Sequence, residues 1–181
     1  MTLKNTPLDG CVLVQPQVFK DQRGSFFESF NQQKFTELYG QVVHFVQDNQ
    51  SISSYGTLRG LHFQQGKYAQ AKLVRVVMGK VLDVVVDVRK DSPTFGQHHS
   101  VELSDENNLQ IFIPKGFAHG FVCLSEKVIF EYKCDAYYQP SAEAGIRFND
   151  PDVNIDWKIP AEDMILSEKD KQLPLLNELK L

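Results

Sequence analysis

The chain has 181 residues, of which 42% are hydrophobic, and a formal net charge of −4 at pH 7. This length is enough for one well-buried domain and hardly enough for two, so we expect residues 1–181 to form a single domain. The acidic balance and the lack of any run of Lys and Arg exclude a general nucleic-acid binder and a protein that binds anionic membrane surfaces.

The cysteine pattern indicates the cellular compartment. Cys11, Cys123 and Cys134 are odd in number, no two of them form a Cys-x-x-Cys pair, and no signal-like apolar segment opens the chain. A disulfide framework is therefore not expected. No apolar run reaches the roughly 20 residues that a membrane-spanning helix needs. We expect a soluble protein of the reducing cytoplasm.

The predicted elements are one helix followed by a series of short strands. Residues 31–39 have helical spacing, with Phe35 and Leu38 on one side. Beyond this helix, β-branched or aromatic runs separated by Gly, Pro, Asn or Asp predict strands over residues 74–77, 81–88, 99–103, 110–113, 120–124 and 128–134. Short strands at this spacing are typical of a β sandwich or barrel.

Residues 47–64 carry the strongest chemical signal. They read QDNQSISSYGTLRGLHFQ and place Arg59 close to His62. A cation beside a group that accepts a proton near neutral pH indicates an anionic substrate and proton chemistry. Regular alternation puts the two side chains on opposite faces of a strand, so a shared site requires a bulge or bend, which we expect at Gly60. The alternative is a hydrogen-bonded histidine with a purely structural role.

Two strands carry candidate polar groups among apolar neighbours. Lys72 shares a strand face with Val74 and Val76, and a buried ammonium group is costly unless an anion pairs with it. The alternative is a lysine that extends to solvent. Tyr132 shares a face with Phe130, where it either packs in a core or donates a proton.

Residues 81–88 and 114–121 add further candidates. In residues 81–88 one face is wholly apolar and the other carries Asp83 and Asp87, so one face is expected to pack a core and the other to line a cavity. The segment PKGFAHGF places His119 after Pro114 and Gly116, whose restricted backbone fixes the position of the ring. Such a histidine suits either metal ligation or substrate contact.

The last predicted element is the Leu-rich tail, residues 160–181, which is expected to be helical. Within it, the sequence SEKD has two interpretations. In one, the Ser167 side chain caps the start of a helix, and the side chain of Asp170, at the third helical position, bonds back to the backbone of Ser167. In the other, Asp170 orients a histidine.

The histidine spacing argues against a metal site. Pro-x-Gly-x-x-His at residues 114–119 resembles the second half of the cupin pattern. The first half normally supplies two histidines and a glutamate, whereas here only His62 stands in that region. His98 and His99 are adjacent, so they point to opposite faces of a strand. We therefore expect a cupin barrel without a metal.

The motifs as a series resemble one enzyme family. In chain order they are DQRGSFFESF, QDNQSISSYGTLRGLHFQ, AKLVRVVMGKVLDVVVDVRKDSPTFG, PKGFAHGF, EYKCDAYYQPSAEAGIRFND and SEKD. Together they resemble the dTDP-4-dehydrorhamnose 3,5-epimerases over nearly the whole chain. This resemblance implies a mainly β, cupin-type jelly-roll barrel with a few peripheral short helices, a homodimer and no cofactor. It also implies an isomerase that inverts C3 and C5 of dTDP-4-dehydro-6-deoxy-D-glucose, giving dTDP-4-dehydro-β-L-rhamnose.

The resemblance further implies catalytic roles. His62 is expected to be the base that removes a proton next to the C4 ketone, with Asp170 holding its tautomer. Lys72 is expected to stabilise the oxygen of the resulting enolate. Tyr132 is expected to return a proton from the opposite face, and a repeat of the cycle at the second carbon explains a double inversion.

Other positions match substrate-binding positions of the family. Arg23 and Arg59 resemble arginines that contact the diphosphate, and Tyr138 stands where an aromatic ring stacks on thymine. His119, oriented by Asp83, is expected to contact the substrate. The remaining expected binding residues are Phe26, Glu28, Gln47, Asp48, Asn49, Glu143 and Lys169. In such families residues 21–30 of one subunit can complete the site of the other.

Two other functions stay open. One is an enzyme of the same scaffold that inverts a single carbon or acts on another deoxysugar nucleotide. The other is a cupin that binds a sugar nucleotide without catalysis. Tyr132 favours protonation from the opposite face, and the presence of both His62 and Lys72 argues against a protein that only binds.

Overall fold

The structure, a computed structural model, describes residues 1–180 as two facing β sheets with short helices around them. The six-stranded sheet contains, in spatial order, β1 (Thr2–Asn5), β2 (Val12–Gln15), β10 (Gln110–Ile113), β7 (Lys72–Met78), β12 (Lys127–Cys134) and β5 (Gln47–Ser54). The five-stranded sheet contains β13 (Glu143–Gly145), β6 (Leu58–Gln64), β11 (Phe117–Cys123), β8 (Lys80–Asp87) and β9 (His98–Ser104). A separate hairpin consists of β3 (Val18–Asp21) and β4 (Gly24–Phe27).

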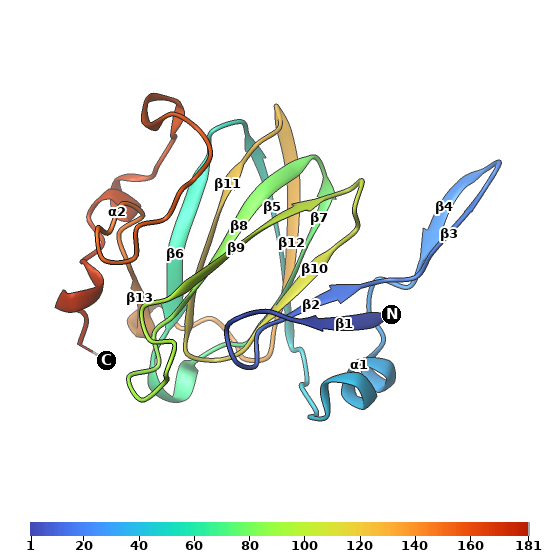
Figure 1. The fold of residues 1–181 in the computed structure, drawn as a ribbon, viewed down its shortest axis with the longest axis horizontal. Coiled ribbons are helices and arrows are strands. Elements are labelled where there is room, and N and C mark those ends of the chain that lie inside the picture. The colour runs from blue at the N-terminus through green and yellow to red at the C-terminus, as the bar shows by residue number, and fades with distance from the viewer. Residues whose placement is uncertain (181) are drawn as a thin grey trace.

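The two sheets close into an antiparallel barrel of the cupin type, which Figure 1 shows with the sheets face to face. All six strands expected from the β-branched and aromatic runs are present, with ends that shift by a few residues at most. The expected mainly β, jelly-roll architecture is therefore confirmed. Side chains alternate between the two faces of any strand with a period of two, so the sequence of each segment by itself is enough to predict these strands.

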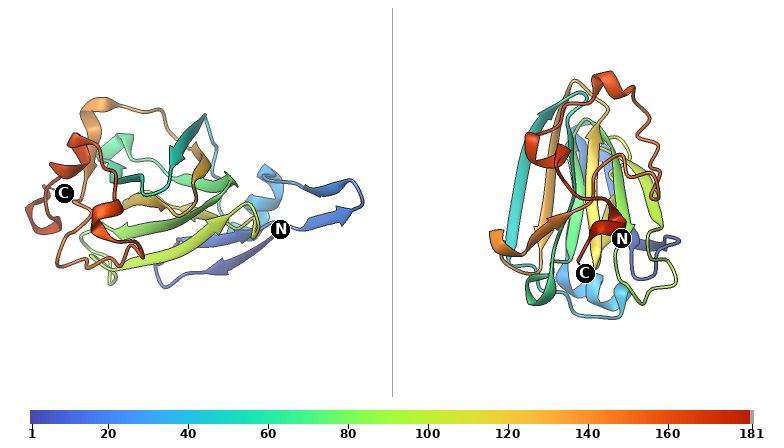
Figure 2. Two further views of the ribbon diagram at one scale, coloured as in Figure 1. Left: turned by 90° about the horizontal axis from the view of Figure 1, so that it is seen from above. Right: turned by 90° about the vertical axis from the view of Figure 1, so that its left-hand side faces the viewer.

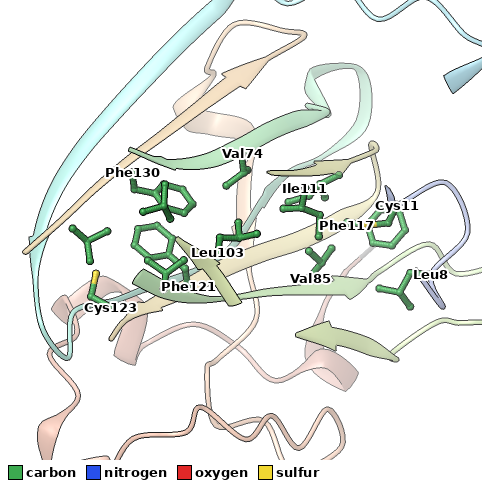
Figure 3. Close-up of a cluster of buried hydrophobic side chains, with 14 residues drawn as sticks. Leu8, Cys11, Val74, Val85, Leu103, Ile111, Phe117, Phe121, Cys123 and Phe130 are labelled. Atoms are coloured by element: carbon green, nitrogen blue, oxygen red, sulfur yellow. The ribbon is translucent and has the colours of Figure 1, made fainter. Parts of the chain in front are cut away.

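The barrel interior is filled by side chains from both sheets (Figure 3). Phe121 of β11 and Phe130 of β12 stack across it, with ring centroids 3.9 Å apart. Other apolar side chains, including Val74, Val85 and Phe117, complete this cluster. Because opposite walls interlock through these contacts, polar groups that point inward from either sheet are held at fixed positions.

Strand β8 is buried on both faces. Val85 packs inside the barrel, whereas Val84 and Val86 pack against a second apolar cluster that contains Trp157 and Leu176 of the C-terminal segment. The apolar face expected to pack a core does so. The mixed face is also buried rather than open, although its Asp83 bonds to a residue of the cavity wall described below.

The predicted helix at residues 31–39 is α1 (Gln32–Tyr39), capped by the Asn31 side chain, which accepts a hydrogen bond from the Lys34 N–H. Phe35 is fully buried against Phe112, but Leu38 is 48% exposed, so the two do not share a buried side as expected. Within residues 1–180, no helix is long and apolar enough to cross a membrane.

The expectation of a helical C-terminal tail is wrong. Residues 160–180 contain only one α-helical turn, α2 (Glu168–Lys171), and two short 3-10 turns, Ala161–Asp163 and Leu176–Glu178. The rest of the tail is extended, and Ile165 forms an isolated bridge with Thr57 beside β6. Leu166, Leu176 and Leu179 of the tail pack into the second apolar cluster, so the leucines of the described tail cover the barrel without forming one face of a helix.

Candidate active site

A cavity of about 640 Å³ opens between the two sheets. An adjoining cavity of about 280 Å³ shares His62, Lys72 and Tyr132 with it. The expected site residues that line one or both cavities are Gln47, Asn49, Arg59, His62, Lys72, His119, Tyr132, Tyr138, Glu143, Lys169 and Asp170. They come from both sheets and from the C-terminal segment, so the fold brings together groups that are far apart in the sequence.

His62 of β6 and Asp170 of α2 form a hydrogen-bonded pair, with Nε2 of His62 2.7 Å from Oδ1 of Asp170. Ser167 caps α2 by accepting a bond from the Asp170 N–H, which places the carboxyl group. Burial raises the pKa of Asp170, but hydrogen bonds from His62 and from the backbone of Gly60 outweigh burial and lower the pKa overall. The carboxylate is therefore charged and favours a proton on Nε2 of His62.

The bend expected at Gly60 is present. His62 pairs with His119 of β11, whereas Arg59 pairs with Phe121, so β6 has one residue more than β11 over this stretch. Gly60 has a φ of +123°, and a Cβ there would lie 2.6 Å from the Cα of Gly120. Only glycine fits this approach. The bulge lets Arg59 and His62 line the same cavity.

Lys72 and Tyr132 lie on neighbouring strands of the six-stranded sheet, across the cavity from His62. Burial lowers the pKa of Lys72, although the charges of Asp83 and Glu143 oppose this effect. Burial also raises the pKa of Tyr132, so its phenol is protonated at neutral pH. The Nζ of Lys72 lies 5.9 Å from the centre of the Tyr132 ring. This wall therefore presents a cation and a proton donor.

His119 makes the expected contact with Asp83. Nε2 of His119 lies 2.8 Å from Oδ2 of Asp83, and both side chains are almost completely buried. The His119 ring also stacks on Phe130, with centroids 6.2 Å apart. The position of the ring is thus set by an ionic hydrogen bond at one edge and an apolar contact on one face.

Four of the expected binding residues form a chain of contacts along the smaller cavity. The side chain of Gln47 accepts a bond from the Tyr138 N–H at 3.0 Å. The Tyr138 hydroxyl donates to Glu143 at 2.5 Å, and the Lys169 ammonium group lies 2.7 Å from the same carboxylate. Burial raises the pKa of Glu143, but its bonds to Lys169 and Tyr138 lower it overall. The cavity rim is thus polar and carries both signs of charge.

Arg23, Phe26 and Glu28 do not line this cavity. They lie on or beside the β3–β4 hairpin, which projects away from the barrel in Figure 1 and in the left view of Figure 2. Phe26 is 70% exposed. Arg23 pairs with Asp21 in the same hairpin, and Glu28 pairs with Lys34. Within one protomer, these side chains are separate from the cavity.

Asp48 also lies apart from the main cavity. Residues of β5 alternate between the barrel interior and the outer face, and Asp48 is on the outer face, where its carboxylate bonds to Lys133 at 2.8 Å. Its neighbours Gln47 and Asn49 point inward and line the cavities. Strand alternation puts Asp48 on the face opposite to Gln47 and Asn49, but only the packing of β5 in the barrel decides which of the two faces points inward.

Sequence reasoning missed several residues of the cavity wall. Ser51, Ile165 and Leu166 line the cavity, and the Ser53 hydroxyl accepts a bond from Nε of Arg59 at 3.2 Å. Alternation along residues 47–54 could have identified both serines, because they share a face with Asn49. No local pattern marks Ile165 or Leu166, since their place depends on how the tail crosses β6.

Within residues 1–180, no group of three or more His, Cys, Asp or Glu side chains is placed to hold a metal ion. The site instead offers a histidine–carboxylate pair on one wall and a phenol and an ammonium group on the other. These are the parts that proton transfer on two sides of one bound molecule requires. A cupin-type barrel with these groups on facing walls suits an enzyme of the isomerase class that acts by moving protons.

Comparison with known proteins gives the family. The family profile described as dTDP-4-dehydrorhamnose 3,5-epimerase matches residues 5–178. A protein of that name from Salmonella typhimurium is 52% identical over 184 residues, which cover 100% of this chain and 98% of its own. The crystal structure of the Elizabethkingia anophelis NUHP1 protein has a TM-score of 0.95 at 56% identity and covers 98% of this chain and 97% of its own.

A further solved structure contains a sugar nucleotide. The Legionella pneumophila Philadelphia 1 protein, in complex with dTDP-4-keto-L-rhamnose, has a TM-score of 0.94 at 48% identity and covers 98% of this chain and 94% of its own. Profile, sequence and structure agree over nearly the full length. The chain belongs to the dTDP-4-dehydrorhamnose 3,5-epimerase family.

Proposed function

We propose that this chain inverts C3 and C5 of dTDP-4-dehydro-6-deoxy-D-glucose and so produces dTDP-4-dehydro-β-L-rhamnose. The observation that carries the proposal is the position of His62 and Tyr132 on facing sheets, where both line one cavity. Inversion requires that a proton leaves one face of a carbon and that another proton arrives at the opposite face. A base and an acid on opposite walls meet this requirement.

His62 is the proposed base. A hydrogen next to the C4 ketone is weakly acidic, and its removal needs a base whose free nitrogen points at the sugar. Asp170 accepts a hydrogen bond from Nε2 of His62, which leaves Nδ1 with the lone pair, and the carboxylate stabilises the imidazolium that forms. Asp170 is therefore a positioning residue that acts through His62.

Lys72 is the proposed partner of the enolate oxygen. Removal of the proton places negative charge on the C4 oxygen, and a preorganised cation in a cavity that excludes water stabilises such charge strongly. The burial that lowers the pKa of Lys72 makes its ammonium group costly unless an anion pairs with it. The developing oxyanion offsets that cost, so the stabilisation is greatest when the reaction needs it.

Tyr132 is the proposed acid. Its raised pKa keeps the phenol protonated, and it stands on the wall opposite His62. Protonation of one carbon regenerates the C4 ketone. His62 then releases its proton to solvent and Tyr132 regains one, and a shift of the sugar that brings the other carbon between them lets the same pair act again. The same groups thus account for both inversions, and repeated use of one site requires no additional base.

Arg59 and the rim residues are the proposed nucleotide site. Ser53 holds Nε of Arg59, so the two terminal nitrogens are available for a diphosphate. The adjoining cavity, lined by Gln47, Tyr138 and Glu143, has the polar and aromatic groups that thymine or a sugar hydroxyl would contact. His119 and Asn49 line the cavity between these regions and are proposed to contact the sugar.

The hairpin residues support a dimer. Arg23 and Phe26 match binding positions of the family but project away from the cavity of their own protomer. We propose a homodimer in which the β3–β4 hairpin of each protomer completes the site of the other. A two-fold axis makes this exchange reciprocal, so each dimer contains two complete sites.

Two further predictions remain part of the proposal. Residues 1–181 are proposed to act as one epimerase domain, which the match of the family profile to residues 5–178 supports. The cytoplasm is proposed as the compartment, which the three buried free cysteines support, because oxidising compartments favour disulfides.

The test is proton NMR of dTDP-4-dehydro-6-deoxy-D-glucose incubated with the protein in deuterium oxide. The expected result is deuterium at both C3 and C5 together with signals of the L-rhamno product. Exchange and inversion at one carbon would replace the proposal with a single-carbon epimerase. Exchange at neither carbon would contradict catalysis on this substrate, and a His62→Ala variant serves as the control for background exchange.

A further inference from the structure

The barrel interior holds an aspartate with one oxygen unused. Asp83 is fully buried, and its Oδ2 contacts Nε2 of His119. Its other oxygen, Oδ1, has no hydrogen-bond partner among residues 1–180, and the same holds for the buried Nε2 of His99. Buried polar atoms in folded proteins are nearly always paired, so two unpaired atoms in one interior require an explanation.

The strand register makes Asp83 a neighbour of both histidines. Val85 of β8 lies directly opposite His119 of β11 on one side and opposite His99 of β9 on the other. Asp83 is two residues from Val85 and points to the same face, so it is the diagonal neighbour of each histidine. The bond between Asp83 and His119 shows that side chains of these two types reach across such a diagonal.

His99 lies on the interior face of β9. Val101 and Leu103, at the next alternate positions of the strand, pack into the interior cluster, and His99 shares their face. Burial lowers the pKa of His99, and the negative charge of Asp83 partly opposes this effect. The ring is therefore neutral near neutral pH and carries one N–H, which the nearby carboxylate favours on Nε2.

We propose that His99 is a positioning residue whose Nε2–H donates to a water molecule that in turn donates to Oδ1 of Asp83. This contact holds the carboxylate from one side while His119 holds it from the other. With both oxygens engaged, the carboxylate cannot rotate, and the His119 ring keeps one orientation at the cavity wall. The predicted effect on turnover rests on the proposed function, whereas the hydrogen bond itself does not.

The first test uses the parent protein labelled with 15N-histidine. Long-range proton–nitrogen NMR spectra distinguish the two neutral forms of each ring. The expected result near neutral pH is a proton on Nε2 of His99, with the His99 signals assigned from their loss in a His99→Gln variant. A proton on Nδ1 would overturn the proposal. This measurement needs no turnover, so it gives an answer even if the deuterium-exchange experiment contradicts the proposed function.

The second test compares three variants. His99→Phe keeps a ring of similar size but no donor, His99→Gln keeps an N–H donor, and His98→Phe changes the neighbour on the opposite strand face. We expect His99→Phe to shift the imidazole signals of His119 and to lower kcat by about tenfold, because the carboxylate loses one charge-assisted bond. We expect His99→Gln to restore kcat to within about threefold of the parent, and His98→Phe to match it.

The His119 signals decide the outcome. Unchanged His119 signals in His99→Phe would overturn the proposal, because in it residue 99 affects His119 only through Asp83. A loss of thermal stability without a shift of these signals would also overturn it, because that result indicates a packing role alone. If His99→Phe does not fold, two other measurements decide the question. One identifies the protonated ring nitrogen of His99 in the parent protein, and the other compares the His119 signals of His99→Gln with those of the parent.

Discussion

Nε2 of His62 and Oδ1 of Asp170 lie 2.7 Å apart, although 108 residues separate them in the chain. The contact joins β6 to the extended tail, and it forms only when the tail crosses the barrel and places α2 beside the cavity. The tail also contributes Lys169 to the rim. Packing of the C-terminal tail onto the barrel is therefore required to form the pair of His62 and Asp170, which contains the proposed catalytic base.

Asp170→Asn is expected to lower kcat by about 10²–10⁴-fold, the range typical of general acid–base catalysis. A neutral amide does not stabilise the imidazolium, and its NH2 group can donate to Nε2 of His62 and so favour the proton on Nδ1. Binding of dTDP, measured by calorimetry, is expected to match the parent protein. Glu168→Gln is the matched control, because Glu168 is an exposed carboxylate of the same helical turn. A kcat for Asp170→Asn equal to that of the control would contradict the role of Asp170.

Arg59→Ala is expected to weaken dTDP binding by about 10- to 100-fold, because charge-assisted hydrogen bonds to the diphosphate are lost. Since the residue does not contact the reacting carbons in this proposal, kcat at saturating substrate should change much less than KM. Arg59→Lys should recover only part of the affinity, because a point charge replaces a planar two-pronged donor. A fall in kcat with unchanged dTDP affinity would remove Arg59 from the nucleotide site.

Tyr132→Phe separates proton removal from proton return. His62 still removes a proton in this variant, so deuterium should enter the substrate from solvent, while formation of the inverted product should fall by about 100-fold or more. The change removes only a hydroxyl and leaves the packing against Phe130 intact. NMR in deuterium oxide measures both quantities in one sample. Normal yields of inverted product would require another acid.

Mixing of two variants tests the exchanged hairpin. Arg23→Ala leaves the cavity of its own protomer intact, and His62→Ala leaves its own hairpin intact. If each site takes the hairpin of the partner, a mixed dimer contains one complete site, and an unfolded and refolded equimolar mixture should recover about a quarter of the parent activity. Activity equal to the mean of the two separate variants would place the hairpin function within one protomer, or outside catalysis.

Asp87 makes a pH-dependent contribution to stability. Its buried carboxylate accepts bonds from Arg89, Ser92 and Thr94. Burial raises its pKa, but these bonds outweigh burial and lower the pKa from 3.8 to about 2. A lowered folded-state pKa stabilises the fold above the unfolded value, and that contribution is lost as pH falls from about 4 towards 2.

The Asp87 contribution is about 2 kcal/mol. Urea unfolding at a series of pH values should therefore show a steeper loss of stability below pH 4 in the parent protein than in Asp87→Asn. The variant should also be less stable at neutral pH, since a neutral amide cannot accept all of these bonds. Asp91→Asn, an exposed neighbour in the same loop, is the control. Parallel pH profiles for parent and Asp87→Asn would contradict the assignment.

Much of the barrel could be predicted because strand formation depends on local alternation. Val84 and Val85 lie on opposite faces of β8 in any packing, and the strand appears where the pattern placed it. The requirement for a bend at Gly60 was also local, because Arg59 and His62 can share a cavity only if the strand period is broken between them. The family resemblance then matched positions on the cavity wall that no single pattern identified.

The sequence by itself determined the mainly β architecture, the bend in β6 and the family. Only the tertiary structure decided the extended course of the tail, the outward direction of Asp48 and the projection of Arg23 away from the cavity of its own protomer. The physical reason is the range of the interactions. A strand period is set by neighbouring residues, whereas these three features depend on which surface each segment packs against, and the residues of that surface lie far away in the chain.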